Sequence, residues 1–134
     1  MAYWLVKSEP DVWSWDDHVK KGIEKWDGVR NYQAANNMKA MKKGDRAFFY
    51  HSNIGKEIVG IVEVVREAYP DPTSPTPHFV LVDFKAVKPL KTPVTLKQIK
   101  DHPALQDTAL IRQSRLSVMP ITKEEWKIIL DLGA

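Results

Sequence analysis

The stretch DRAFFYHSNIGKEIVGIVEVV, residues 45–65, decides the predicted fold. Its two flanks, 45–52 and 57–65, are rich in aromatic and β-branched residues, which favour β-strands. Between the flanks lies Asn53-Ile54-Gly55, a sequence typical of a hairpin turn. Gly60, inside the second flank, indicates a bulge or tight bend of the kind that curls a sheet. The stretch therefore predicts an antiparallel hairpin within a curved sheet.

Segments on both sides of this hairpin supply the other predicted elements. Strands are predicted at 3–7, at 78–87 with Phe79, Leu81 and Phe84 as core candidates, and at 112–120. Helices are predicted at 14–21, 33–43 and 95–101 and from 122 onward, the last two opening on the capping boxes Thr95–Gln98 and Thr122–Glu125. The proline-rich stretch 69–77 is predicted as a stiff loop that serves as a lid or rim. About five to six strands with short helices packed around them favour an α+β domain on a small curved sheet or partly open barrel.

The composition predicts one domain over residues 1–134 and restricts its chemistry. The chain is 43% hydrophobic and 28% charged, as in globular proteins, and its lack of cysteine excludes disulfides and thiolate chemistry. No apolar run approaches the roughly 20 residues that span a bilayer, and the N-terminus is typical of a strand and not of a signal peptide, so we expect a cytoplasmic protein. The net charge of +3 permits a polyanionic partner without requiring one.

Motifs for catalysis or cofactor binding are missing from the sequence. It has no glycine-rich phosphate loop and no GxSxG elbow, and its four histidines do not have the spacing of metal ligands. We therefore expect a binding module, with no cofactor and no metal, and not an enzyme.

Polar and aromatic residues gather instead at predicted strand ends and turns. In KWDGVRNYQAANNM, residues 25–38, a tryptophan precedes an Asp-Gly turn and is followed by Arg30, Asn31 and Tyr32. Segments 7–11, 50–53 and 112–115 also leave or open strands, so all four can lie near one rim of the sheet, where binding residues commonly occur.

Each of these residues also has a purely structural interpretation. Trp4 and Trp126 are expected in the core, whereas Trp26 either plugs a hole or offers a face for stacking. His51 suits a structural role, and the direction of Tyr50 stays open. Ser8 and Asn53 could do no more than cap turns.

Four stretches carry a resemblance to a known family: YWLVKSEPDVWSWDD, WDGVRNYQAANNMKAMKKGDRAFFYHSN, GIVEVVREAYPDPT and RQSRLSVMPIT. Together they resemble the EVE-domain family, in its thymocyte-nuclear-protein-like branch, from Tyr3 to about Leu130. One departure is a shorter loop after YPDPT, with Phe79 where family members tend to carry tryptophan.

The resemblance implies a PUA-like fold, a curved pseudo-barrel sheet with helices at its edges, related to YTH domains. It implies a non-catalytic module that accepts a modified nucleobase of DNA or RNA, flipped out or single-stranded, into an aromatic and polar pocket. The ligand-binding residues we expect from it are Lys7, Ser8, Glu9, Trp26, Arg30, Asn31, Tyr32, Tyr50, His51, Ser52 and Arg115.

The resemblance also suggests roles for these residues. Trp26 is expected as a stacking wall, and Tyr50 with His51 as the second wall or its support. Lys7, Ser8 and Glu9 would line one edge, Asn31 and Ser52 would read donors and acceptors, and Arg30 and Arg115 would hold phosphate or a ligand carboxylate.

Two other functions stay open for the same pocket. One is a shape-selective RNA-binding module that uses the lysines of 39–43 and 85–100. The other is a small-molecule sensor or an enzyme. The expected partner is nucleic acid that carries a modified base, with no membrane, bound by a monomer.

Overall fold

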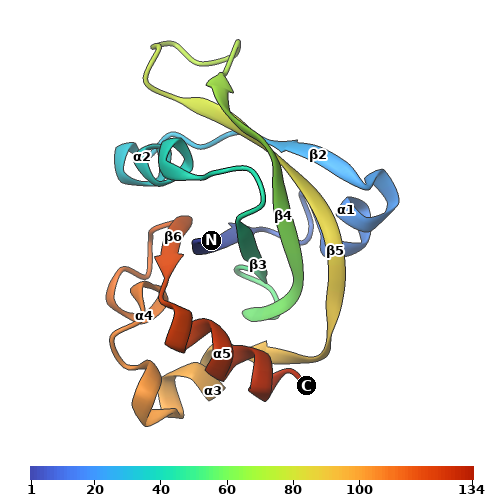
Figure 1. Ribbon diagram of the computed structural model, residues 1–134, viewed down its shortest axis with the longest axis vertical. Coiled ribbons are helices and arrows are strands. Elements are labelled where there is room, and N and C mark those ends of the chain that lie inside the picture. Colours follow the sequence, from blue (N-terminus) through green and yellow to red (C-terminus); the bar gives the residue numbers. More distant parts are fainter.

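A curved six-stranded mixed sheet organises the computed structural model, which describes residues 1–134 (Figure 1). The strands are β1 (Tyr3–Ser8), β2 (Ile23–Trp26), β3 (Arg46–His51), β4 (Glu57–Pro70), β5 (Val80–Thr95) and β6 (Val118–Ile121). They lie in the order β2-β5-β4-β3-β1-β6. The helices are α1 (Trp15–Lys21), α2 (Tyr32–Ala40), α3 (Leu96–Asp101), α4 (Ala109–Arg112) and α5 (Lys123–Leu132), with a 3₁₀ turn at Pro103–Leu105. The predicted α+β class is confirmed.

The predicted hairpin is confirmed as β3 and β4, which pair antiparallel. Its turn places Asn53 and Gly55 at positive φ, 64° and 89°, which asparagine and glycine tolerate better than other residues. The register shifts next to Gly60 on both sides of β4, as the predicted bulge requires. β4 and β5 run far longer than expected, 14 and 16 residues, and bend together around the core (Figure 1).

Both faces of the central strands are buried. Neighbouring residues of a strand point to opposite faces, so Phe48 stacks on Trp126 of α5 (ring centroids 3.9 Å apart) while Phe49 meets Trp15 of α1 (5.4 Å). β1 lies beside β3, pairs with it in parallel and is buried along its middle. Trp4 and Trp126 are core residues, as predicted, with 7% and 5% of their surface exposed.

Capping determines where most helices begin. The predicted boxes Thr95–Gln98 and Thr122–Glu125 are both formed, and Ser14 with Asp17 forms a third at α1. The predicted helix 33–43 ends early, at Ala40, because the backbone of Met41 turns to an extended conformation (ψ 141°) that keeps its side chain in the core.

Three predictions along the chain were wrong. Trp26, expected in the turn 26–31, instead ends β2 (residues 23–26), a strand that was not predicted, because β5 extends far enough to pair with it. The predicted strand 112–120 is shortened to β6 at 118–121, since α4 continues to Arg112. The proline-rich loop begins one residue after Pro70, later than predicted, because β4 pairs with β5 up to that residue.

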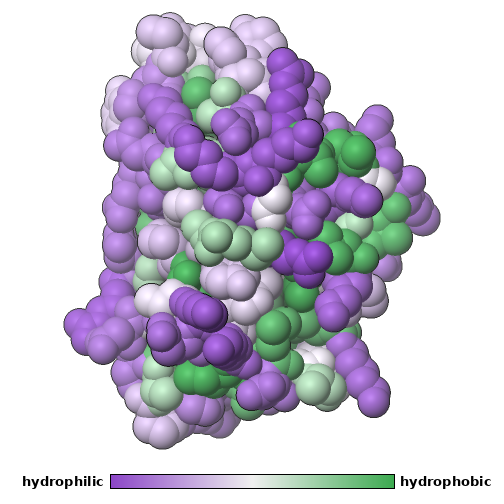
Figure 2. All heavy atoms as spheres, in the orientation of Figure 1, coloured by the Kyte–Doolittle hydropathy of each residue, from purple (hydrophilic) through white to green (hydrophobic).

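The surface is mostly hydrophilic in the view of Figure 2, with apolar patches between charged groups. Among the exposed large apolar side chains are Val19 on α1 and Ile23 on β2, at 49% and 50% exposure. No helix in the structure has the length and apolar composition that crossing a bilayer requires.

Candidate nucleobase pocket

A cavity of about 340 Å³ is lined by the end of β1, the turn that follows it, and residues of β2. Its lining comes from Lys7, Ser8, Glu9, Val12, Trp13, Glu24, Lys25, Trp26 and Asp27. The 7–11 segment and the tryptophan turn therefore do meet, as the sequence predicted. A volume of this size falls at the lower end of the roughly 300–1,000 Å³ found for ligand pockets.

Trp26 forms the inner end of this pocket and is mostly covered. Its ring packs edge-to-face on Phe49 and Phe84, with centroid distances of 5.5 and 5.6 Å. Only 7% of the residue is exposed. The prediction of an open stacking wall is therefore wrong: Trp26 fills the core and leaves little of its surface to the pocket.

Trp13 is the pocket aromatic that sequence reasoning missed. It is partly exposed, and its backbone N–H donates to the Glu9 carbonyl at 2.9 Å while its own carbonyl accepts from the Ser8 hydroxyl. Its indole Nε1–H donates to His18 Nδ1 at 3.0 Å. The signal that could have found it is a tryptophan in the turn directly after Glu9-Pro10, where a strand has just ended.

His18 is buried behind the pocket between the two indoles. Its ring centroid lies 6.0 Å from that of Trp13 and 6.2 Å from that of Trp26. Its Nε2 lies 2.9 Å from the Phe84 carbonyl oxygen. Burial lowers the pKa of His18, while that carbonyl and the charge of Glu24 act in the opposite direction.

Charged groups of both signs surround the pocket. Lys7 Nζ donates to the Ser114 carbonyl at 2.8 Å and lies 5.8 Å from the Tyr50 ring, and burial lowers its pKa. Glu9 Oε1 accepts from Asn53 Nδ2 at 2.7 Å, which leaves its second carboxylate oxygen free for another donor. The pocket thus offers an ammonium donor and carboxylate acceptors within one small volume.

Seven of the eleven predicted site residues do not line the pocket, and three of these, around the start of α2, lie away from it. Arg30 binds the Asp71 carboxylate (3.1 Å) and the Thr73 hydroxyl (3.1 Å), and Asn31 caps α2 by accepting from the Ala34 N–H at 2.9 Å. Tyr32, 60% exposed, packs on His78 and Phe79 near the start of β5.

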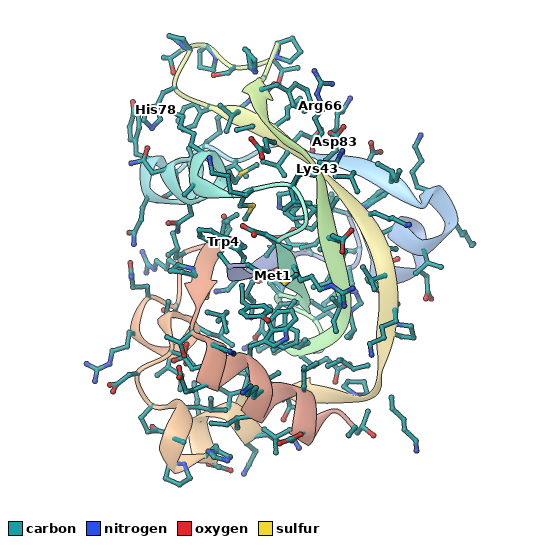
Figure 3. All side chains as sticks on the ribbon, viewed as in Figure 1. Met1, Trp4, Lys43, Arg66, His78 and Asp83 are labelled. Carbon is teal, nitrogen blue, oxygen red and sulfur yellow. The ribbon has the colours of Figure 1, made fainter.

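The expectation that these three converge with Trp26 is wrong, because residues 27–31 run away from β2 toward α2 (Figure 1). Residues 27–31 lead to Tyr32, which packs on His78, labelled at the upper left of Figure 3.

The β3 end supports the pocket without lining it. Tyr50 is buried, with 3% exposure, and burial raises its pKa. His51 Nε2 accepts from the Trp15 backbone N–H at 3.0 Å, and Ser52 N–H donates to the Ser8 carbonyl at 2.9 Å. The first contact holds the start of α1 and the second holds the end of β1. Arg115 is exposed, next in the chain to Ser114, whose carbonyl holds Lys7.

A second hollow, of about 400 Å³, lies on the other side of the β3–β4 turn. It is lined by Gly55, Lys56, Thr95, Leu96, Lys97, Lys100 and Asp101. The turn joins the two cavities: Asn53 contacts Glu9 of the first, and two residues later Gly55 lines the second. We call it the lysine hollow. No group of three or more His, Cys, Asp or Glu side chains is arranged to hold a metal ion.

Comparison with known proteins gives the family. The sequence matches the EVE domain over residues 2–132. Thymocyte nuclear protein 1 of Mus musculus is 38% identical over 169 aligned residues, which cover 97% of this chain and 73% of the relative. Because that aligned span exceeds the 134 residues of this chain, the mouse relative carries inserted residues within it.

Solved structures agree with the sequence match. The NMR structure of a Rhodopseudomonas palustris protein, 63% identical, superimposes with a TM-score of 0.94 and covers 99% of this chain and 93% of its own. The crystal structure of the human THYN1 protein in complex with DNA that contains 5-methylcytosine is 34% identical, with a TM-score of 0.87 and coverage of 99% and 98%. From the match over nearly its whole length, this chain belongs to the EVE domain family.

Proposed function

We propose that this protein is a non-catalytic binding module that accepts a modified base of DNA into the pocket between Trp13 and Trp26. The observation that carries the proposal is the pocket itself, in which two indoles and a set of hydrogen-bonding groups border one volume of about 340 Å³. The human relative that was solved with 5-methylcytosine DNA supports it, since its fold matches over 99% of this chain.

A base must leave the helical stack to enter such a pocket, which costs a few kcal/mol. Stacking on an aromatic ring returns roughly 1–3 kcal/mol per base. A methyl group on the base adds about 0.8 kcal/mol when it is buried against apolar surface. Trp13 is the ring available for stacking, because Trp26 is 93% covered by its own neighbours and leaves little surface for a ligand.

The polar lining suits a base that has both an amino donor and a carbonyl acceptor. The carboxylates of Glu9 and Glu24 only accept hydrogen bonds, as the exocyclic amino group of cytosine requires. The Lys7 ammonium only donates, as the cytosine carbonyl requires. Thymine and uracil lack the amino group and offer these carboxylates only their ring N–H, so we expect them to bind more weakly.

The groups in and behind the pocket that resemble catalytic residues are already engaged within the protein. The Ser8 hydroxyl donates to the Trp13 carbonyl, and both ring nitrogens of His18 have partners. A hydroxyl and an imidazole held in this way position the walls of a site and are not arranged as a nucleophile and its base.

The lysine hollow is placed to contact the phosphate backbone beside a bound base. Lys56, Lys97 and Lys100 face it, and Lys97 is paired with Asp101 at 2.8 Å. A strand whose base enters the pocket can continue past the β3–β4 turn to this hollow, because the turn borders both.

The test is the affinity for otherwise identical oligonucleotides that carry 5-methylcytosine, cytosine or thymine at one position, measured by fluorescence anisotropy. We expect preference for 5-methylcytosine, and we expect Trp13→Ala to abolish it while thermal melting shows a folded protein. Tyr32→Ala is the matched control, since this exposed aromatic residue lies outside the pocket. Equal affinity for all three oligonucleotides, or tighter binding of RNA or of a free nucleoside, would overturn the proposal.

A further inference from the structure

The hydrogen bonds of His18 leave it one protonation state. An indole N–H can only donate and a backbone carbonyl can only accept, so Nδ1, which faces Trp13, carries the lone pair, and Nε2, which faces Phe84, carries the proton. The imidazole is therefore neutral and in a single tautomer. A second proton on Nδ1 would point at the indole N–H and remove its acceptor.

The hydrogen bond from the Trp13 indole N–H to His18 Nδ1 orients the Trp13 ring. The other two hydrogen bonds of Trp13, to Glu9 and from Ser8, hold its backbone and leave the side-chain torsions free. Trp13 is only partly buried, so packing alone confines the indole less than it confines Trp26. The acceptor at His18 thus decides whether the indole lies along the pocket wall.

From this geometry we infer that His18 is a positioning residue for base recognition: neutral His18 holds the Trp13 indole as the pocket wall, and its protonation releases that wall. The inference deepens the proposed function and, for its effect on affinity, rests on it.

The surroundings of His18 oppose protonation at neutral pH. The rings of Phe49 from β3 (5.7 Å) and Trp26 from β2 (6.2 Å) pack on it, and β5 contributes the Phe84 carbonyl. Glu24 of β2 is the charged group that acts on it and favours the protonated form, but burial is the larger influence and the pKa is lowered.

A second histidine near the pocket must be separated from His18 in any pH experiment. His51 lies beyond Phe49, 5.7 Å from that ring, and its Nε2 also accepts an N–H, from Trp15. Burial lowers its pKa too, against the charges of Glu57 and Asp16.

A pair of amide substitutions separates the two hydrogen bonds of His18. The carbonyl oxygen of an asparagine at this position can occupy the place of Nδ1, so H18N keeps the acceptor for Trp13 and loses the Phe84 bond. The longer H18Q reaches the place of Nε2, so it keeps the Phe84 bond and loses the acceptor for Trp13. Neither amide titrates, and both leave His51 unchanged.

The first measurement is the affinity for the 5-methylcytosine oligonucleotide. We expect H18N to bind like the unmodified protein at neutral pH and H18Q to bind about fivefold to tenfold more weakly, the effect of about one hydrogen bond. As the pH falls from neutral toward the acid limit of folding, the affinity of the unmodified protein should fall relative to that of H18N, which keeps the acceptor for Trp13. Equal affinities and equal pH profiles for the three proteins would overturn the inference.

The second measurement needs no ligand and covers the case in which a buried substitution prevents folding. The Trp13 indole N–H resonance, assigned by its loss in Trp13→Phe, should move as the unmodified protein titrates through the His18 pKa. A resonance that does not move at any acidic pH at which the protein stays folded overturns the inference. If the unmodified protein binds no modified oligonucleotide, the proposed function fails, whereas this resonance still decides whether His18 controls Trp13.

Discussion

A Cβ atom on Gly60 would lie 2.6 Å from the indole ring of Trp15, closer than any real side-chain contact allows. Gly60 pairs with Phe49 across the sheet, and the Trp15 ring meets Phe49 edge-to-face at 5.4 Å. Trp15, the first residue of α1, therefore packs into the space that a side chain on Gly60 of β4 would occupy. This contact docks α1, which carries His18, on the sheet behind the pocket.

Gly60→Ala should destabilise the protein by about 1–3 kcal/mol, as overpacking in a well-filled core generally does. Urea denaturation measures the loss. The atoms in contact belong to the six-membered ring of Trp15, so the same substitution in a Trp15→Phe background should cost less than in the unmodified protein. Additive costs for the two changes would show that the overlap does not cause the loss.

Asp45 should make stability depend on pH in the acid range. Burial alone would raise its pKa, but the N–H groups of Lys42, Ala2 and Trp4 donate to the carboxylate, and the pKa falls below the usual value. Because the folded-state pKa is the lower one, this stabilisation is complete above the ordinary aspartate pKa of about 3.9 and is lost as the pH falls through the folded value.

Urea denaturation at a series of pH values checks this dependence. Asp45→Ala leaves the buried Trp4 indole N–H and two backbone N–H groups without an acceptor and should cost about 2–3 kcal/mol near neutral pH, with less effect in acid. Asp131→Asn on α5, an exposed acid with no side-chain hydrogen bond, is the control. A constant difference between Asp45→Ala and the unmodified protein at every pH would contradict the prediction.

Arg30→Gln tests whether this arginine stabilises a loop or binds the ligand. Arg30 bridges to Asp71, whose side chain is 2% exposed, and to Thr73, so its loss should lower stability by up to about 1 kcal/mol, given that Arg30 itself is 38% exposed. Affinity for the modified oligonucleotide should stay the same, because Arg30 lies outside the pocket. A large loss of affinity with unchanged stability would show that Arg30 belongs to the binding site.

The lysine hollow should contribute to the salt dependence of DNA binding. Replacing Lys56 and Lys100 with glutamine should lower the slope of log affinity against log salt by about 1–2, roughly 0.9 for each phosphate contact on duplex DNA. Preference for 5-methylcytosine over cytosine should not change. The control replaces Lys39 and Lys42, exposed lysines at the end of α2, which lies far from α3 (Figure 1). Equal slopes for the two double variants would show that the hollow is not a phosphate contact.

Local signals in the sequence predicted a large part of the fold. The hairpin around Asn53-Ile54-Gly55, the bulge at Gly60 and the capping boxes at Thr95 and Thr122 all formed as expected. Each of these features depends on residues within a few positions of one another, through turn geometry or side-chain bonds to a nearby backbone N–H. Such interactions are present before the chain folds as a whole.

The candidate site was predicted only in part, because much of it depends on contacts that form only when the chain folds. Lys7, Ser8, Glu9 and Trp26 were expected together and do line one cavity, because the curved sheet brings the end of β1 near β2 although three strands separate them in the sheet. Arg30 and Asn31 were wrongly placed there, since their polar groups bind Asp71, 41 residues away, and the first turn of α2. Trp13 was missed, because its role depends on a histidine that only the folding of α1 brings to its indole.

The sequence by itself determined the family, the hairpin and the helix starts, all of which depend on motifs and short-range interactions. The tertiary structure alone decided that β2 is a strand, that Trp26 is covered and that Trp13 is the available ring. The first follows from the length of β5, and the second from packing of Trp26 against Phe49 and Phe84, residues far from it in the chain, which leaves the partly exposed Trp13 as the available ring. Burial and long-range pairing depend on which surfaces meet after folding, and no local pattern encodes that choice.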